Sequence, residues 1–251
     1  MLFSRHLAIL QSLLTVKRVR SLVRSLNARI FHLKFETEQR IGRLWKTFCF
    51  GSLVQRFGDM QWRFSNTHGE TESLEGYMVY CLSLEGQTDD APWPFIIHNL
   101  VTMNATFYWT TIKSHLSFRT IFECLEKEED RPPYRWILFG PARSGTGLHV
   151  DQVGIHAWVT LIQGCKRWIL FPPDSSSCNV QLHNPQIPSA IWFHDHYNNT
   201  TSSDEMPIIE CIQYPGETVF VPAGWPHAVL NLEFSVAVTH NYATNRPEFW
   251  S

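Results

Sequence analysis

The fold is indicated most directly by residues 215–227, Pro-Gly-Glu-Thr-Val-Phe-Val-Pro-Ala-Gly-Trp-Pro-His. A β-branched and aromatic run, 218–221, stands between two Gly/Pro turns, which is the pattern of a strand in an antiparallel sheet. Similar short runs precede and follow it, at 208–213, 229–232 and 236–242. Short strands at close spacing with Gly/Pro turns favour a jelly roll or a barrel.

Further strands and helices are predicted on the N-terminal side of this stretch. Residues 136–139 read as a short buried strand, and the runs 155–162 and 165–171 flank Gln163-Gly164, which predicts a hairpin with a tight turn. Residues 174–207 are polar and interrupted by proline, so we expect a long loop there. Three more elements are expected before residue 131: an amphipathic helix through residues 45–57 ending near Gly58, a strand at 76–84 and a helix within 115–128. Residues 89–92 read as a turn, which is followed by the apolar run 95–97.

The composition fits one globular domain with a basic N-terminal segment. The chain has 251 residues, of which 44% are hydrophobic, and its net charge of −2 predicts neither nucleic-acid nor membrane binding. Its six cysteines form no CxxC pair, so we expect reduced thiols of an intracellular protein rather than a zinc finger. Residues 1–34 contain seven Lys or Arg and no acid, which suits a basic amphipathic helix or a mitochondrial transit peptide. We expect three parts: a basic helical segment over 1–44, a mixed region over 45–130 and a β core over 131–251.

A candidate metal site is formed by His149, Asp151 and His227. Residues i and i+2 of a strand point to the same face, so His149 and Asp151 can bind one ion. His227 follows the turn at 222–224, which could bring it from an adjacent strand. Two imidazoles and one carboxylate are the ligand set of the facial triad that binds Fe(II) and leaves positions open for O2. A bare His-x-Asp is common, and a surface histidine beside a turn aspartate is the alternative.

Other histidines fit a metal site less well. His194-Asp195-His196 lies in the polar loop and is expected to be solvated, and His156 has the wrong strand parity to join His227. We expect His183 and His240 to be ordinary surface or core residues.

Four motifs resemble the Jumonji-C (JmjC) domain. They are residues 131–136 (Arg-Pro-Pro-Tyr-Arg-Trp), 140–151 (Gly-Pro-Ala-Arg-Ser-Gly-Thr-Gly-Leu-His-Val-Asp), 164–168 (Gly-Cys-Lys-Arg-Trp) and 215–227. The similarity extends from about Trp45 to Trp250 and is nearest the branch of bifunctional arginine demethylases and lysyl hydroxylases, once called phosphatidylserine-receptor-like. The resemblance implies a mainly β fold with flanking helices, the double-stranded β-helix or cupin-like jelly roll.

The resemblance also implies a cofactor set and residue roles. Fe(II), 2-oxoglutarate as co-substrate and O2 would be used, and His149, Asp151 and His227 would be the catalytic metal ligands. Lys166 matches the lysine that pairs with the distal carboxylate of 2-oxoglutarate. The remaining co-substrate contacts that the family implies are Thr146, Thr239 and Asn241.

Two positions depart from the family pattern. Val159 stands where relatives commonly carry Asn, and no Tyr occurs near Trp93-Pro94-Phe95 where a co-substrate contact is expected.

From the resemblance as a whole, we expect an oxygenase that demethylates arginine or hydroxylates lysine in a protein or peptide. Histones and RNA-processing factors are examples of such substrates. A catalytically weakened JmjC binding module is the alternative, and a cupin enzyme acting on a small molecule is a weaker one. We expect a nuclear protein, with the mitochondrion or cytoplasm as alternatives, and the sequence leaves the oligomeric state open.

Overall fold

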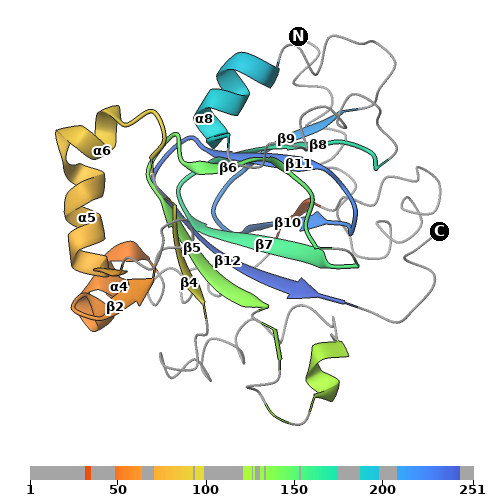
Figure 1. Ribbon diagram of the computed structural model, residues 1–251, viewed down its shortest axis with the longest axis horizontal. Coiled ribbons are helices and arrows are strands. Elements are labelled where there is room, and N and C mark those ends of the chain that lie inside the picture. The colour runs from red at the N-terminus through yellow and green to blue at the C-terminus, as the bar shows by residue number, and fades with distance from the viewer. Residues whose placement is uncertain are drawn as a thin grey trace.

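The computed structural model of this chain describes residues 32–34, 49–63, 71–92, 94–98, 121–125, 127, 131–132, 134–152, 154–173, 187–197 and 208–243 (Figure 1). Within that part the strands are β1 (His32–Lys34), β2 (Gln61–Arg63), β3 (Thr71–Ser73), β4 (Phe95–His98), β5 (Arg135–Gly140), β6 (Gly145–His149), β7 (His156–Gln163), β8 (Lys166–Leu170), β9 (Ile209–Gln213), β10 (Glu217–Val221), β11 (His227–Asn231) and β12 (Ser235–Tyr242). The helices are α4 (Phe50–Phe57), α5 (Leu74–Leu82), α6 (Leu84–Thr88), α8 (Ser189–Ile191), the 3-10 helix η2 (Ile121–Cys124) and the π-helix η5 (Trp192–His196).

Two antiparallel sheets lie face to face in the part of the chain that the structure describes (Figure 1). The larger sheet has the order β1-β10-β7-β12-β5-β4, the smaller has the order β6-β11-β8-β9, and β2 pairs with β3 separately. From β5 to β8, and again from β9 to β12, successive strands alternate between the two sheets. This alternation is the winding of a double-stranded β-helix, so the predicted mainly β fold is confirmed.

Apolar side chains fill the interior between the two sheets. Ala157, Val159 and Leu161 of β7 face Trp168 and Leu170 of β8 across this space, and all five are buried. Because alternate residues of a strand share a face, these positions define the interior parity of their strands. A polar residue of the same parity therefore also faces the interior, and this rule locates the candidate site.

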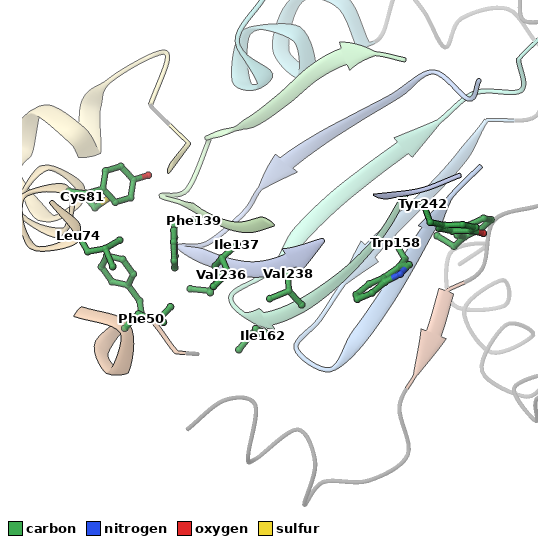
Figure 2. Close-up of a cluster of buried hydrophobic side chains, with 13 residues drawn as sticks. Phe50, Leu74, Cys81, Ile137, Phe139, Trp158, Ile162, Val236, Val238 and Tyr242 are labelled. Carbon is green, nitrogen blue, oxygen red and sulfur yellow. The ribbon is translucent and has the colours of Figure 1, made fainter. Parts of the chain in front are cut away.

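The outer face of the larger sheet is covered by helices. Phe139 of β5 packs against Phe50 of α4, with ring centroids 5.5 Å apart, and Leu74 and Tyr77 of α5 join the same cluster (Figure 2). α4 is the predicted amphipathic helix, and Phe50 and Leu53 are its buried residues. The helices thus stabilise the larger sheet from outside and leave its interior face available for the site.

The outer face of the smaller sheet is covered by the segment that contains α8 and η5. Trp192 and Phe193 pack against Ile169 of β8, together with Leu148, Phe171 and Ala228. Arg167 of β8 attaches this segment to the sheet, because its guanidinium lies 4.7 Å from the ring centroid of Tyr197. Glu210 of β9 joins the two residues: its Oε1 accepts from Nε of Arg167 at 2.6 Å and its Oε2 accepts from the hydroxyl of Tyr197 at 2.8 Å. The predicted loop over residues 174–207 is therefore wrong for residues 189–196, since aromatic side chains fix a helix there.

The predicted strand over residues 76–84 is also wrong, because residues 74–82 form α5. Ser73 caps this helix: its hydroxyl oxygen accepts a hydrogen bond from the backbone N–H of Gly76 at 2.9 Å. Leu74, Tyr77 and Cys81 then fall on one helical face and are buried against the larger sheet. The apolar run looked strand-like because its aromatic and β-branched residues favour strands locally.

The predicted hairpin around Gln163-Gly164 is wrong although both of its strands exist. β7 lies in the larger sheet and β8 in the smaller one, so the two strands do not pair. Gly164 turns the chain from one sheet to the other with a φ of 91°, a region that favours glycine. A Cβ at this position would lie 2.3 Å from the carbonyl oxygen of Phe234, so the crossing requires glycine sterically as well.

Several other predictions can be compared with the described residues. The strands predicted at 136–139, 208–213, 218–221, 229–232 and 236–242 correspond to β5, β9, β10, β11 and β12, and the apolar run 95–97 lies in β4. The helix predicted within 115–128 corresponds to the short η2, while residues 115–120 lie outside the described part. Three residues of the basic segment, His32–Lys34, form a strand beside β10 rather than a helix, and the rest of residues 1–44 lies outside the described part. Of the described helices, none is long and apolar enough to cross a membrane.

Five of the six cysteines lie in the described residues, and all five are free thiols. Cys81 and Cys165 are buried, Cys49 and Cys211 are partly buried, and Cys124 is exposed. Cys178 lies outside the described residues.

Candidate metal and co-substrate site

Two of the predicted metal ligands are direct neighbours on adjacent strands. β6 ends at His149, β11 begins at His227, and the two residues are cross-strand partners. Their ring centroids lie 4.2 Å apart. Because Val229 belongs to the interior cluster, His227 has interior parity, and its partner His149 points to the same side.

Asp151 completes the group just beyond the end of β6. Its Oδ1 lies 3.6 Å from Nε2 of His149, and one potential ligand atom of each of the three residues lies within 4.8 Å of the others. Two atoms that bind one metal at right angles, each about 2.1 Å from it, lie about 3 Å apart. The three side chains therefore need only small movements to fit one ion. His227 is buried, whereas His149 and Asp151 are 25% and 22% exposed, so the group is open on one side.

Backbone carbonyls orient both imidazoles for this role. Nδ1 of His149 lies 2.9 Å from the carbonyl oxygen of Gly147, and Nδ1 of His227 lies 2.9 Å from that of Trp225. A carbonyl oxygen can only accept, so Nδ1 carries a proton in both rings, and in the neutral form of each ring Nε2 presents a lone pair. A histidine that binds a metal through one nitrogen commonly donates its other N–H in this way.

The charges of the three residues are coupled. Burial lowers the pKa of His227 well below its ordinary value, and the neighbouring His149 lowers it further. Burial also opposes the charged form of His149, but the hydrogen bond and the charge of Asp151 outweigh burial and raise its pKa. Burial would raise the pKa of Asp151, yet His149 and His227 hold it below its ordinary value. Without a metal, the group therefore holds one carboxylate and a neutral His227, and a divalent metal that binds His149 displaces any proton on its Nε2.

A β-bulge in β6 brings Thr146 to the same face as His149. Val229 of β11 pairs with Thr146 of β6, and His227 of β11 pairs with His149 of β6. One residue of β11 lies between its two paired residues, whereas two residues of β6 lie between theirs, so β6 contains one extra residue. Gly147 and Leu148 occupy the bulge on the outer side, where a Cβ on Gly147 would lie 2.3 Å from the carbonyl oxygen of Ile187. Thr146 is exposed and therefore available at the open side of the group.

Lys166 is a buried cation on the same interior face. It pairs with Asn231 in register, two positions before Trp168 of the interior cluster, and only 5% of its surface is exposed. Its Nζ donates to Oδ1 of Asn231 at 2.6 Å, and no carboxylate forms an ion pair with it in the described part of the chain. Burial lowers the pKa of Lys166 to about 8. A buried ammonium without an acidic partner is suited to bind an anion from outside.

β12 supplies the two remaining predicted contacts. Ala237 belongs to the interior cluster, so Thr239 and Asn241 share the interior parity; Thr239 is buried and Asn241 is partly buried. Thr239 is the register partner of Val159, which is buried on the same face. The departure from the family pattern at Val159 therefore falls inside the same space. Trp93 lies outside the described residues.

The other histidines are placed away from this group. His156 stacks against the rings of Phe220 and Tyr242 on the outer face of the larger sheet, and His240 packs against Tyr134 and Trp158 on that face. The side chain of His194 is 88% exposed, so it is solvated as predicted, although it lies on η5 and not in a loop. His183 lies outside the described residues.

Three buried polar or aromatic residues near the group were not predicted as part of the site. Trp168 stacks on His227, with ring centroids 6.3 Å apart, and its Nε1 donates to Oε1 of Gln213 at 2.9 Å. Asn231 contacts Lys166 as described. The sequence signal was present for Gln213 and Asn231, since each is a polar residue at an interior-parity position of an apolar strand.

Comparison with known proteins agrees with this geometry. Residues 136–242 match the model of the JmjC domain family, described as a hydroxylase. The chain is similar to the lysine-specific demethylase JMJ21 of Arabidopsis thaliana, with 35% identity over 212 residues, covering 81% of this chain and 22% of that protein.

Two further relatives carry names that concern the same chemistry. The bifunctional arginine demethylase and lysyl-hydroxylase psr-1 of Caenorhabditis elegans is 45% identical over 125 residues, covering 47% of this chain and 31% of that protein. The 2-oxoglutarate and iron-dependent oxygenase JMJD4 of Homo sapiens is 32% identical over 128 residues, covering 48% of this chain and 30% of that protein. The chain thus spans less than a third of the length of these curated relatives.

Proposed function

We propose that this chain, whose residues 136–242 match the JmjC domain family, is an Fe(II)- and 2-oxoglutarate-dependent oxygenase that acts on protein side chains. One observation carries the proposal: His149, Asp151 and His227 present ligand atoms within 4.8 Å of one another. The printed names of the relatives, which include demethylases, a lysyl hydroxylase and 2-oxoglutarate and iron-dependent oxygenases, support it.

The residues of the site have distinct roles in this proposal. His149, Asp151 and His227 would hold the ferrous ion, with both imidazoles binding through Nε2. The bound ion supplies chemistry in which O2 places one oxygen atom in a substrate C–H bond and the other in succinate, with release of CO2. Lys166 would bind the distal carboxylate of 2-oxoglutarate, and Thr146, Thr239 and Asn241 would add hydrogen bonds to the same molecule.

Arginine and lysine side chains of a protein or peptide are the proposed substrates, because the relatives are named for them. Oxygen insertion into an N-methyl group gives a hydroxymethyl amine that releases formaldehyde, whereas insertion into a lysine C–H bond leaves an alcohol. A nuclear location remains part of the proposal, with the mitochondrion and the cytoplasm as alternatives.

A second candidate function is a JmjC-fold binding module with weakened or absent catalysis. Val159 favours it, since this buried side chain lies on the interior face and cannot form a hydrogen bond to a bound dianion. If metal-loaded protein fails to bind 2-oxoglutarate in a calorimetric titration, the second candidate is supported over the first.

The test of the proposed function is turnover of 2-oxoglutarate with a matched pair of histidine variants. Purified protein with Fe(II), ascorbate and O2 should convert 2-oxoglutarate to succinate, followed by NMR. His149→Ala should reduce the rate at least about a hundredfold, since loss even of a group that only supports a ligand costs metal affinity about 10- to 100-fold. His194→Ala, at an exposed histidine, is the control and should leave the rate unchanged.

The same samples identify the reaction on peptides. Incubation with methyl-arginine and lysine peptides, followed by mass spectrometry, should show either loss of a methyl group with formaldehyde or gain of one oxygen atom. Equal succinate formation by wild-type protein and His149→Ala would contradict the proposal.

A further inference from the structure

Asn231 is held rigidly at the buried end of the site. Its backbone N–H donates to the carbonyl oxygen of Ser144 at 2.8 Å, and its own carbonyl accepts from the backbone N–H of Arg143 at 2.7 Å. Its side chain is 3% exposed and lies opposite Lys166, its register partner on β8. The amide therefore has little freedom to move away from the lysine.

A chain of hydrogen bonds fixes which way this amide points. Ser144 Oγ donates to the carbonyl oxygen of Pro141 at 2.7 Å, so its single proton is already used. It must then accept from Asn231 Nδ2, which lies 2.8 Å away. Because Nδ2 faces Ser144, Oδ1 faces the other way and accepts from Nζ of Lys166 at 2.6 Å. The opposite orientation would place Nδ2 against the ammonium of Lys166, donor against donor, so the hydrogen-bond partners determine the orientation of the amide.

Gly140 leaves the space that this arrangement needs. A Cβ at residue 140 would lie 2.2 Å from Ser144 Oγ and 2.5 Å from Asn231 Nδ2. Ser144, Lys166 and Asn231 are all at most 5% exposed, so solvent cannot replace their contacts. The network is built into the fold at the end of β5, the start of β6 and the end of β11.

We propose that Asn231 is a positioning residue that orients the ammonium of Lys166 for the distal carboxylate of 2-oxoglutarate and, being neutral, leaves that charge available to it. An ammonium has three N–H groups, and Asn231 uses one of them. An aspartate of the same shape would neutralise the lysine and repel the incoming carboxylate. This inference rests on the proposed function, since it assumes that 2-oxoglutarate is the anion bound.

The test compares two ligands that differ in whether they reach Lys166. 2-Oxoglutarate has a distal carboxylate, whereas oxalate binds a metal through two oxygens and ends there. Dissociation constants of both are measured by calorimetry without O2 on Mn(II)-loaded protein, a readout independent of turnover. Asn231→Asp should weaken 2-oxoglutarate binding about a hundredfold, and Asn231→Ala about tenfold, with oxalate binding unchanged.

Ser144→Ala keeps the test usable if the Asn231 variants fail to fold. It removes the hydroxyl that fixes the amide, and it should weaken 2-oxoglutarate binding about threefold with no change for oxalate. The role of Asn231 would be overturned by either of two results, provided that wild-type protein binds Mn(II) and 2-oxoglutarate. In the first, the folded variants bind 2-oxoglutarate as tightly as wild type; in the second, they lose affinity for 2-oxoglutarate and oxalate in parallel. Wild-type protein that binds neither Mn(II) nor 2-oxoglutarate would instead contradict the proposed function.

Discussion

The interior of the double-stranded β-helix and the outer face of its larger sheet each bury aromatic and histidine side chains, but they combine them differently. In the interior, His149, His227 and Asp151 each have one potential ligand atom within 4.8 Å of the others, and the two imidazole ring centroids lie 4.2 Å apart. On the outer face, His156 stacks against Phe220 and Tyr242 and accepts a hydrogen bond from the backbone N–H of Ala223 at 3.0 Å. A buried histidine is therefore a candidate ligand only where a carboxylate and a second imidazole share its face.

A substitution on the outer face should lower the free energy of unfolding without changing metal affinity, and this is the largest expected effect. Phe139→Ala removes a ring that is 2% exposed and packs against Phe50 on the outer face, and it should lower the free energy of unfolding by about 3–5 kcal/mol. Its folded fraction should bind Mn(II) with wild-type affinity. Urea unfolding measures the first quantity and calorimetry the second.

The matched variant for this comparison is His149→Ala, from the interior. It should lose metal affinity while its free energy of unfolding without metal changes much less than that of Phe139→Ala, because His149 is partly exposed. If Phe139→Ala lost metal affinity in its folded fraction, or His149→Ala were the less stable of the two, the division between the faces would fail.

Much of this division follows from strand parity, which the sequence displays. The interior residues Ala157, Val159 and Leu161 alternate with outer ones, and the same reading placed His156 on the wrong side for the metal group. His149, Asp151 and His227 could be proposed from their types and spacing before any geometry was known. What the sequence does not display is which strands pair, so the turn at Gly164 was taken for a hairpin instead of a crossing between sheets.

Two local features also escaped the sequence for physical reasons. Simple alternation puts Thr146 and His149 on opposite faces, and only the bulge in β6 brings them together. α5 depends on a cap at Ser73 and on burial against a distant sheet, whereas its residues taken alone favour a strand. Tertiary packing determines both the bulge in β6 and the helix α5. The propensity or periodicity of a short stretch of sequence carries no information about that packing.

Without a bound anion, the buried ammonium of Lys166 should lower the free energy of unfolding. The pH dependence of unfolding measures this loss. The pKa of this residue falls from 10.5 to about 8 on folding because the ammonium is buried. Between these values the unfolded chain holds more protons, so stability rises with pH; below about pH 8 the penalty is fully present. The difference of about 2.5 units corresponds to roughly 3 kcal/mol.

Comparison with Lys166→Met isolates this contribution. Burial also raises the pKa values of Cys81, Cys211 and Tyr242, whose titration lowers stability at high pH in both proteins. As the pH rises above 8, the free energy of unfolding of wild type should therefore increase relative to that of Lys166→Met, by up to about 1.4 kcal/mol per pH unit. Parallel curves from pH 7 to 10 would show that the buried ammonium is not destabilising.

The smallest expected effect tests whether the outer face reaches the metal group through the turn that precedes His227. His156→Phe keeps an aromatic ring against Phe220 and Tyr242 but removes the acceptor for the N–H of Ala223. Because Ala223 is partly exposed, water can replace part of that bond, and the loss should be about 1 kcal/mol, or a melting temperature lower by roughly 2–4 °C. His156→Asn, which restores an acceptor without the ring, is the matched variant. Mn(II) affinity should change less than about threefold in both; a tenfold loss confined to His156→Phe would mean that this hydrogen bond also positions His227, and the two faces would no longer be independent.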